Sequence, residues 1–296
     1  MSDQRVESVT TDPVPQTSQT GKPRHGTDWW AEAKGIFWLV LAVLGFHSFI
    51  AKPFYIPSES MMPTLIKGDR LVVTKYPYGW SYVSPSFHLL PFMKGRILGR
   101  LPERGDIVIV TPVGQTTDYI KRVIGLPGDR LEVRGGTVIL NGVPVKRETM
   151  TPAMIPVDAN VTCDGDRMEG RRVSGADGKL YCALPRVRET LPNGVSFDTI
   201  DLEYLPEVDD YPAITIPEGH VFLMGDNRDQ SADSRVSAGR NGLDGPVPVE
   251  NLGGRAEFIT FSLDGASELW NPISWLTALR GGRAGTSLHP DRDEGQ

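Results

Sequence analysis

The sequence has few cysteines, few histidines and no excess of basic residues, and each shortage excludes a class of protein. Its 296 residues contain only Cys163 and Cys182, which are too few for a disulfide-rich scaffold and have no zinc ligands at a suitable spacing. The formal net charge of −6 argues against a nucleic-acid-binding protein, because such proteins usually carry a basic surface. Walker and dinucleotide-binding glycine patterns are absent, so we expect no nucleotide cofactor. Metal ligands at a useful spacing are also absent, so we expect no metal site.

Histidine offers little choice of a catalytic base. Besides His220, the histidines are His25, His47, His88 and His289. Only His220 stands beside polar motif residues, and Gly219 before it indicates a turn at the start of a strand, so a Ser-His-Asp triad is disfavoured. Paired carboxylates of the glycosidase type can be drawn from Asp226, Asp229 and Asp233, but nothing else in the sequence indicates a sugar site.

The sequence has a single long apolar run, GIFWLVLAVLGFHSFIA, at residues 35–51. As a helix it would span roughly 26 Å, near the lower limit for crossing a bilayer. We expect one transmembrane helix there. A buried core helix stays open, and a cleaved signal peptide fits poorly because no small-x-small site follows. Residues 1–34 are expected to be a disordered tail, placed in the cytoplasm by the cations before the run.

Beyond residue 52 the sequence is typical of many short strands. Apolar or alternating runs are separated by glycine and proline turns, and Asn141-Gly142 is a typical two-residue hairpin turn. The predicted strands cover residues 70–75, 106–110, 118–124, 131–133, 137–140, 143–145, 215–217, 221–224 and 255–262. The chain is therefore predicted to be mainly β.

Composition changes divide the part of the chain that follows the apolar run. The expected parts are a catalytic β domain at 52–145 and 211–262, an inserted cap subdomain at 146–210 and a C-terminal tail at 263–296. Residues 77–103 are too apolar for an ordinary solvated loop, so we interpret them as a lobe on the membrane surface or a packed Ω-type loop. The tryptophans at 269–279 suit either a membrane interface or packing against the barrel.

Two features offer chemistry: a serine stretch and a lysine inside a strand. Ser58 and Ser60 stand two residues apart between prolines, soon after the apolar run. Lys121 lies in an otherwise apolar strand, whose alternation puts Tyr119 and Val123 on the same face. Burial lowers the pKa of a lysine, and a neutral amine at pH 7 requires a drop of about three units, or roughly 4 kcal/mol. A lysine on the solvated face of an edge strand stays open from the pattern alone.

Four segments together resemble the boxes of bacterial type I signal peptidases (leader peptidases), in the order of that family. They are PSESMMPTL at 57–65, RGDIV at 104–108, YIKR at 119–122 with GLPGD at 125–129, and GDNRDQSADSR at 225–235. The resemblance covers roughly residues 35–262. It implies a serine endopeptidase without a cofactor. The predicted fold class is then mainly β, with a membrane-anchored antiparallel β-barrel-like catalytic domain, an inserted cap subdomain and one N-terminal transmembrane helix.

The resemblance also implies roles for the polar residues of these boxes. Ser60 corresponds to the nucleophile and Lys121 to its general base, since a serine hydroxyl needs a base to become a good nucleophile. The Ser58 hydroxyl and the Ser60 backbone N–H correspond to an oxyanion hole, and Ser231 to the group that orients the lysine amine. The last box supplies residues that correspond to structural groups behind the site, namely Asp226, Arg228, Asp233 and Arg235.

The implied partners are exported preproteins, whose signal peptides end in small-x-small residues, and the phospholipid bilayer. Shallow apolar pockets would admit alanine, and the peptide would add to the domain as a strand. The expected pocket residues are Phe54, Ile56, Pro57, Met61, Leu65, Leu71, Tyr119 and Ile120. The implied location is the bacterial cytoplasmic (inner) membrane, single-pass, with the N-terminus in the cytoplasm and the catalytic domain periplasmic or external. In that compartment Cys163 and Cys182 are expected to be bridged.

The chain departs from the family pattern at Glu59, where glycine is common, at Gln230, where asparagine is common, and over residues 236–245. No role for Glu59 follows from the sequence. Two other functions stay open. A self-cleaving Ser-Lys protease of the repressor type is disfavoured by the apolar run and by the absence of a helix-turn-helix pattern. The other is a non-catalytic, membrane-tethered β module that binds peptides.

Overall fold

The structure, a computed structural model of the 296-residue chain, describes residues 29–84, 94–165, 167–268 and 270–292. The chain divides into two compact units, Met1–Leu41 and Ala42–Gln296. The expected disordered tail falls mostly outside the described residues, and so do residues 85–93 of the apolar segment 77–103. The predictions for those residues stay predictions.

Helix α1 covers Trp29–Phe49 and contains most of the long apolar run. It begins six residues before the run, because Ala31, Glu32 and Lys34 favour a helix although two of them are charged. The Lys34 ammonium lies 5.5 Å from the centre of the Trp30 ring, one turn away on the same helix. By length and composition α1 is able to cross a membrane, and none of its most apolar window is buried in the protein. This exposure argues against the core-helix alternative.

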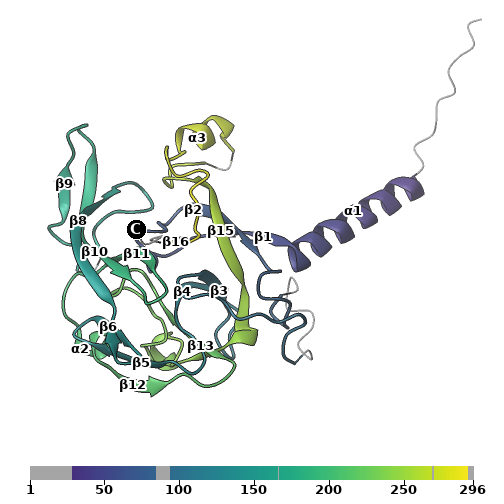
Figure 1. Ribbon diagram of the computed structural model, residues 1–296. Helices are drawn as coiled ribbons and strands as arrows, with labels where there is room; N and C mark the ends of the chain where they lie inside the picture. The colour runs from purple at the N-terminus through teal and green to yellow at the C-terminus, as the bar shows by residue number, and fades with distance from the viewer. Residues whose placement is uncertain (1–28, 85–93, 166, 269, 293–296) are drawn as a thin grey trace, which may run out of the picture. The chain divides into compact units, whose positions relative to one another are not determined.

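The largest sheet has seven strands and is antiparallel throughout (Figure 1). In spatial order its strands are β1 (Ala51–Tyr55), β2 (Asp69–Thr74), β15 (Leu252–Ser262), β3 (Ile107–Val110), β4 (Tyr119–Gly125), β13 (His220–Met224) and β14 (Val247–Pro248). The sheet curls into a half-barrel whose first and last strands do not pair with each other. The prediction of a mainly β, barrel-like domain is confirmed at this level.

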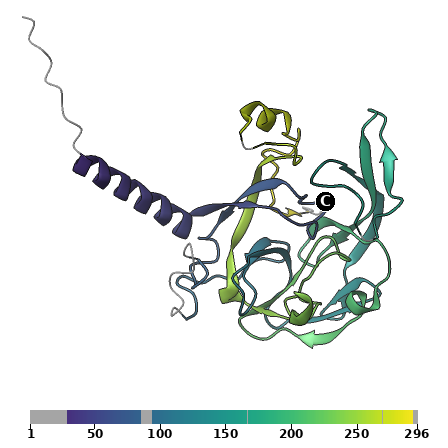
Figure 2. The same ribbon diagram turned by 180° about the vertical axis from the view of Figure 1, so that it is seen from behind.

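Two smaller sheets complete the fold. The first contains β12 (Tyr211–Thr215), β5 (Arg130–Arg134), β6 (Thr137–Leu140) and β7 (Val143–Pro144). The second contains β16 (Asp291–Arg292), β11 (Val195–Ile200), β10 (Leu180–Thr190) and β8 (Lys146–Pro156), with β9 (Arg172–Ser174) paired to β10. Figure 2 shows this second sheet from behind, with the long strands β8 and β10 side by side. The remaining elements are α2 (Pro206–Asp209), α3 (Pro272–Thr277) and the 3-10 turns η2 (Ala238–Arg240) and η3 (Val249–Asn251).

The hairpin turn at Asn141-Gly142 forms as predicted. Leu140 pairs with Val143, so the loop has two residues, and both have positive φ angles, 52° for Asn141 and 83° for Gly142. Asparagine and glycine are the residues that tolerate this conformation, which matches the twist of the flanking strands. The short strands β6 and β7 are thereby set by local sequence.

Residues 146–210, expected to form a cap subdomain, supply strands β8 to β11 and helix α2. They belong to the same compact unit as the seven-stranded sheet, Ala42–Gln296. An isolated bridge joins Ile200 at the end of β11 to Asn227 in the polar loop after β13. The insertion is therefore tied to the loop that carries the last sequence box.

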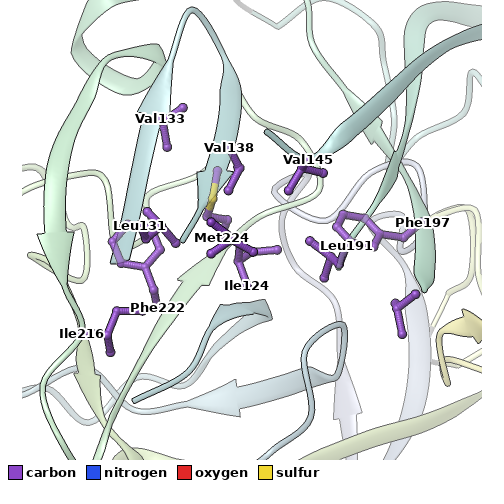
Figure 3. Packing of buried hydrophobic residues seen from close by; sticks show 12 residues of the cluster. Ile124, Leu131, Val133, Val138, Val145, Leu191, Phe197, Ile216, Phe222 and Met224 are labelled. Atoms are coloured by element: carbon purple, nitrogen blue, oxygen red, sulfur yellow. The ribbon is translucent and has the colours of Figure 1, made fainter. Parts of the chain in front are cut away.

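Buried apolar side chains from different sheets form the core. One cluster, shown in Figure 3, brings Leu131 and Val138 of the small sheet against Phe222 and Met224 of β13. A second cluster lies under the serine stretch and includes Ile56, Met61 and Leu65. At about 25 cal/mol per Å² of buried apolar area, each large side chain there contributes roughly 2 kcal/mol. The serine stretch is thus held by its own apolar residues.

Cys163 and Cys182 form a disulfide within a third cluster. Their Cα atoms lie 5.7 Å apart, and the cluster also contains Met62 and Ile66 from the segment that follows Ser60. The bridge therefore anchors the loop after Cys163 beside the serine stretch.

We expect replacement of both Cys163 and Cys182 by serine to lower the free energy of unfolding by about 3 kcal/mol. The bridge joins residues 19 apart in sequence, and closing a loop of that length restricts the unfolded chain by about this amount. Urea denaturation followed by fluorescence measures the effect. A reducing agent should destabilise the wild type alone. Equal stability of the two proteins would show that the bridge contributes nothing.

Candidate active site

The serine stretch leaves the sheet at the end of β1 and is pinned from below. Ile56, Met61 and Leu65 are each at most 1% exposed and pack into the cluster beneath the stretch, whereas Ser58 is exposed and Ser60 lies in the cavity wall. The Ile56 N–H donates to the Asp69 carbonyl at 2.9 Å, and the Gly68 N–H donates back to the Ile56 carbonyl at 3.0 Å. The result presents Ser58 and Ser60 to a cavity.

Lys121 lies in the middle of β4 and points at Ser60. Its Nζ donates to the Ser60 Oγ at 3.0 Å, although 61 residues separate them in sequence. Both residues are buried, with 4% of Lys121 and 7% of Ser60 exposed. Tyr119 and Val123 pack in one apolar cluster and Ile120 in another, as the alternation predicts. The solvated-face alternative for Lys121 is therefore wrong.

The surroundings of Lys121 weaken its hold on a proton. Burial lowers its pKa to about 8, and the charge of Arg235 acts in the same direction, whereas Asp233 and Asp226 raise it. Removal from water disfavours the ammonium form, and here this effect exceeds the attraction of both carboxylates. With a pKa of about 8, roughly a tenth of the amine is neutral at pH 7. A neutral amine 3.0 Å from a hydroxyl is able to accept its proton.

The polar loop after β13 braces the serine stretch from behind. The Asn227 N–H donates to the Ser60 carbonyl at 3.1 Å, and the Asn227 Nδ2 donates to the Glu59 carbonyl at 3.2 Å. A Cβ atom on Gly225 would lie 2.5 Å from the Ser60 carbonyl oxygen and 2.2 Å from the Ser231 Oγ, so only glycine fits there. Sequence reasoning missed both roles, although Gly225 and Asn227 belong to the GDN motif that it singled out.

Four charged residues of this loop are buried and paired. Asp226 accepts from the Arg122 Nε at 2.7 Å and Nη2 at 2.6 Å, and from the Thr64 Oγ1 at 2.6 Å. Arg235 pairs with Asp233 at 2.9 Å. Arg228 pairs with Glu189 of β10 at 2.6 Å. Removing one partner of such a pair leaves an uncompensated buried charge, so these contacts fix the loop.

Ser58 and Ser231 lie near the pair formed by Ser60 and Lys121. The Ser58 Oγ is exposed to the cavity and lies 3.4 Å from the Ser60 Oγ. The Ser231 Oγ is buried and has no hydrogen-bond partner among the described residues. The expected bond from Ser231 to the Lys121 amine is therefore not formed in this arrangement, although Ser231 packs against Gly225 beside Ser60.

The cavity in front of Ser60 has a volume of about 300 Å³ and lies between β1 and β4. Of the expected pocket residues, five line it: Phe54, Ile56, Pro57, Tyr119 and Ile120. The other three, Met61, Leu65 and Leu71, do not line it and instead lie wholly buried in the cluster beneath the serine stretch. Apolar character alone does not distinguish a pocket wall from the core below it.

The edges of two strands face this cavity with unpaired backbone. Among the described residues β1 pairs with β2 alone, so its other edge is open. Strand β4 pairs with β13 only from Arg122 onward, which leaves Tyr119 and Ile120 unpaired on that side. Unpaired strand edges are able to accept an extended peptide as an additional strand. No group of three His, Cys, Asp or Glu side chains suited to a metal occurs within the described ranges.

Comparison with known proteins gives one consistent result. The family model "Signal peptidase, peptidase S26" matches residues 29–261. The chain is 35% identical over 254 residues to signal peptidase I of Rickettsia akari, covering 83% of this chain and 82% of that protein. It is 37% identical over 221 residues to signal peptidase I of Rickettsia typhi, covering 72% and 73%. A crystal structure of a signal peptidase I from Enterococcus faecalis is 26% identical, covers 53% of this chain and 97% of that chain, and has a TM-score of 0.27.

Proposed function

The chain belongs to the signal peptidase family, peptidase S26, as a serine endopeptidase that removes signal peptides, and from this premise we propose that Ser60 and Lys121 form its catalytic dyad. The observation that carries the proposal is the 3.0 Å contact between the Lys121 Nζ and the Ser60 Oγ. Family membership argues against the two alternatives, a repressor-type self-cleaving protease and a non-catalytic binding module.

In the first step neutral Lys121 takes the proton of the Ser60 hydroxyl. The Ser60 Oγ then forms a bond to the carbonyl carbon of the scissile peptide, and the carbon–nitrogen bond breaks as the Lys121 ammonium returns its proton to the leaving nitrogen. Water, activated by the same amine, hydrolyses the ester and frees the signal peptide. Because the amine acts twice, its neutral form has to be restored between the two steps.

The negative charge that develops on the carbonyl oxygen of the scissile peptide has to be stabilised by hydrogen-bond donors. The Ser60 backbone N–H and the Ser58 hydroxyl are proposed for this task, supported by the 3.4 Å separation of the two hydroxyls. Ser231 is proposed to orient the Lys121 amine once substrate is bound, supported by its buried and unpartnered Oγ beside Ser60. Catalytic hydrogen bonds are often long or unmade without substrate.

The cavity supports a preference for small-x-small cleavage sites. Its walls, Phe54, Tyr119 and Ile120, are apolar, and a volume of about 300 Å³ leaves room for small side chains beside the peptide backbone. The open edges of β1 and β4 are proposed to pair with the residues before the scissile bond. Exported preproteins are thus the proposed substrates.

Helix α1 is proposed to anchor the enzyme in the cytoplasmic (inner) membrane as a single span, with the N-terminus in the cytoplasm and the catalytic unit outside. The concentration of cations before the span supports this orientation. Ile273 and Leu276 of α3 and the neighbouring Trp270 are exposed by 72%, 73% and 92%, which suits contact with the bilayer surface. The described parts of 77–103 are proposed to lie at the same surface.

The purified full chain in detergent is expected to cleave a preprotein with an Ala-x-Ala site, releasing the mature protein. Mass spectrometry of the new N-terminus identifies the bond, and a matched preprotein with phenylalanine as the last residue of the signal peptide serves as control. The control should be cleaved at least about 100-fold more slowly, because the wrong side chain does not fit the pocket. Equal cleavage of both preproteins would contradict the proposed pocket, and no cleavage of either would contradict the function.

A further inference from the structure

Glu59 separates the two serines and is the one residue from Phe54 to Ser60 that does not line the cavity. Its backbone carbonyl is held by the Asn227 Nδ2 at 3.2 Å and by the Met62 N–H at 3.1 Å. Its position relative to Ser60 is therefore fixed. The side chain is half-buried and lies near the disulfide-bridged loop, where a Cβ atom on Gly165 would lie 4.0 Å from the Glu59 Oε2.

This placement puts the Glu59 carboxylate outside the cavity that Ser58 and Ser60 line. The cavity is lined mainly by residues 54–58 and 117–121, and the proposed function places the segment before the scissile bond in it. The chain after the scissile bond has to leave on another side of Ser60. The loop that begins at Cys163 lies beside the Glu59 side chain, and the disulfide together with Met168 anchors it in the core.

The Glu59 carboxylate has no counter-ion in contact. Among the described residues no cation forms an ion pair or a hydrogen bond with it, and Lys67 acts on it only at a distance. Burial raises its pKa, which reflects the cost of removing a carboxylate from water without a partner. Two charged side chains of the adjacent loop are already paired, Asp164 with Arg172 and Arg167 with Glu203, both at 2.6 Å.

We propose that Glu59 is a specificity-determining residue, which binds a cationic side chain in the first two residues after the scissile bond. The inference rests on the proposed function of Ser60 and Lys121. A cation at that place supplies the partner that the carboxylate lacks, whereas an acidic side chain is repelled by it. The enzyme therefore discriminates between preproteins by the charge at the start of the mature segment, in addition to the small residues before the bond.

The test uses three preproteins that differ only at the second residue after an Ala-x-Ala site, which is lysine, glutamine or glutamate. With the full-length enzyme in detergent at low salt, kcat/KM is expected to be about tenfold higher for lysine than for glutamate, the effect of one partly buried ion pair. Glu59→Gln is expected to reduce this ratio to below about twofold, and Glu59→Lys to invert it. In the wild type the ratio should decrease as salt increases.

Asp164→Asn is the matched control, because it removes a carboxylate of the adjacent loop that is already paired with Arg172. It should keep the tenfold ratio. A wild-type ratio near one, or a Glu59→Gln enzyme that keeps the wild-type ratio, overturns the proposal. If Glu59→Gln lowered kcat/KM by the same factor for all three preproteins, the role of Glu59 would be purely structural and the proposal would be wrong too. Failure of the wild type to cleave any of the three would instead remove the proposed function on which the inference rests.

Discussion

Lys121→Ala is expected to lower kcat/KM for preprotein cleavage by at least about 10⁴-fold, and Ser60→Ala by a similar factor. The two groups act as one unit, because the hydroxyl is a poor nucleophile without the base and the base has nothing to deprotonate without the hydroxyl. The double variant should therefore be no worse than either single variant. Initial rates of cleavage of an Ala-x-Ala preprotein, with folding checked by circular dichroism, measure the series.

Two comparisons make this expectation specific to the dyad. Lys121→Arg keeps the positive charge but replaces the amine with a group that is not deprotonated in proteins, so it should be as inactive as Lys121→Ala. Ser58→Ala removes only one of the two proposed oxyanion donors and should lower kcat/KM less, by about 10²- to 10³-fold. If Lys121→Arg or Lys121→Ala kept activity within tenfold of the wild type, another base would have to serve Ser60.

Lys75 provides a matched control for a buried lysine outside the site. Like Lys121 it is 4% exposed, and burial lowers its pKa to about 8. Its Nζ donates to the Ser84 carbonyl and makes no contact with either cavity serine. Lys75→Met should therefore keep kcat/KM within a few-fold of the wild type, whatever it does to stability. Buried and easily deprotonated lysines are not by themselves catalytic, and the contact with a serine hydroxyl makes the difference.

The strands around the site are largely predictable because local patterns determine them. The expected strand at 118–124 is β4 at Tyr119–Gly125, and the expected closing strand at 255–262 is the later part of β15 at Leu252–Ser262. Alternation along β4 gives the side on which Lys121 lies. The hairpin at Asn141-Gly142 follows from two residues alone. In each case the deciding interactions lie within a few residues of one another.

The parts of the site that depend on distant contacts do not follow from such patterns. Asn227 braces Ser60 across the molecule, and its hydrogen bonds to the backbone at Glu59 and Ser60 leave no local signal. Met61, Leu65 and Leu71 are as apolar as the residues of the cavity wall, yet they pack into the core. Strand β16 pairs with β11 across about 95 positions in sequence. Closing so long a loop costs entropy, which is offset only when the folded core has formed.

Resemblance to a family supplies roles that patterns leave open, but it supplies nothing where the chain departs from the family. Glu59 shows this limit. Its neighbours Ser58 and Ser60 receive roles by position, whereas the carboxylate between them becomes interpretable only from its place beside Gly165 and away from the cavity. The structure thus contributes most at the residue for which the sequence suggested no role.

The pH dependence of kcat/KM is expected to show an ascending limb with a midpoint near pH 8, falling about 50-fold between pH 8 and pH 6. The active form has a neutral Lys121, and burial lowers the pKa of this amine to about 8. Below that pH the amine becomes protonated and the active fraction decreases tenfold per pH unit; above it the rate levels off. An unperturbed lysine would place the midpoint near 10.4. Initial rates at low preprotein concentration, over pH 5.5 to 10, give the profile.

Lys75→Met tests the assignment of that limb, because Lys75 also has a pKa of about 8 and titrates over the same range. The variant should keep the midpoint, since the Lys75 amine does not contact Ser60. Loss of the ascending limb in Lys75→Met would show that the limb reports Lys75 and not Lys121. A wild-type midpoint at pH 10 or above would mean that burial does not lower the pKa of Lys121. A midpoint near 8 in both proteins ties the rate to the one amine that lies 3.0 Å from a serine hydroxyl.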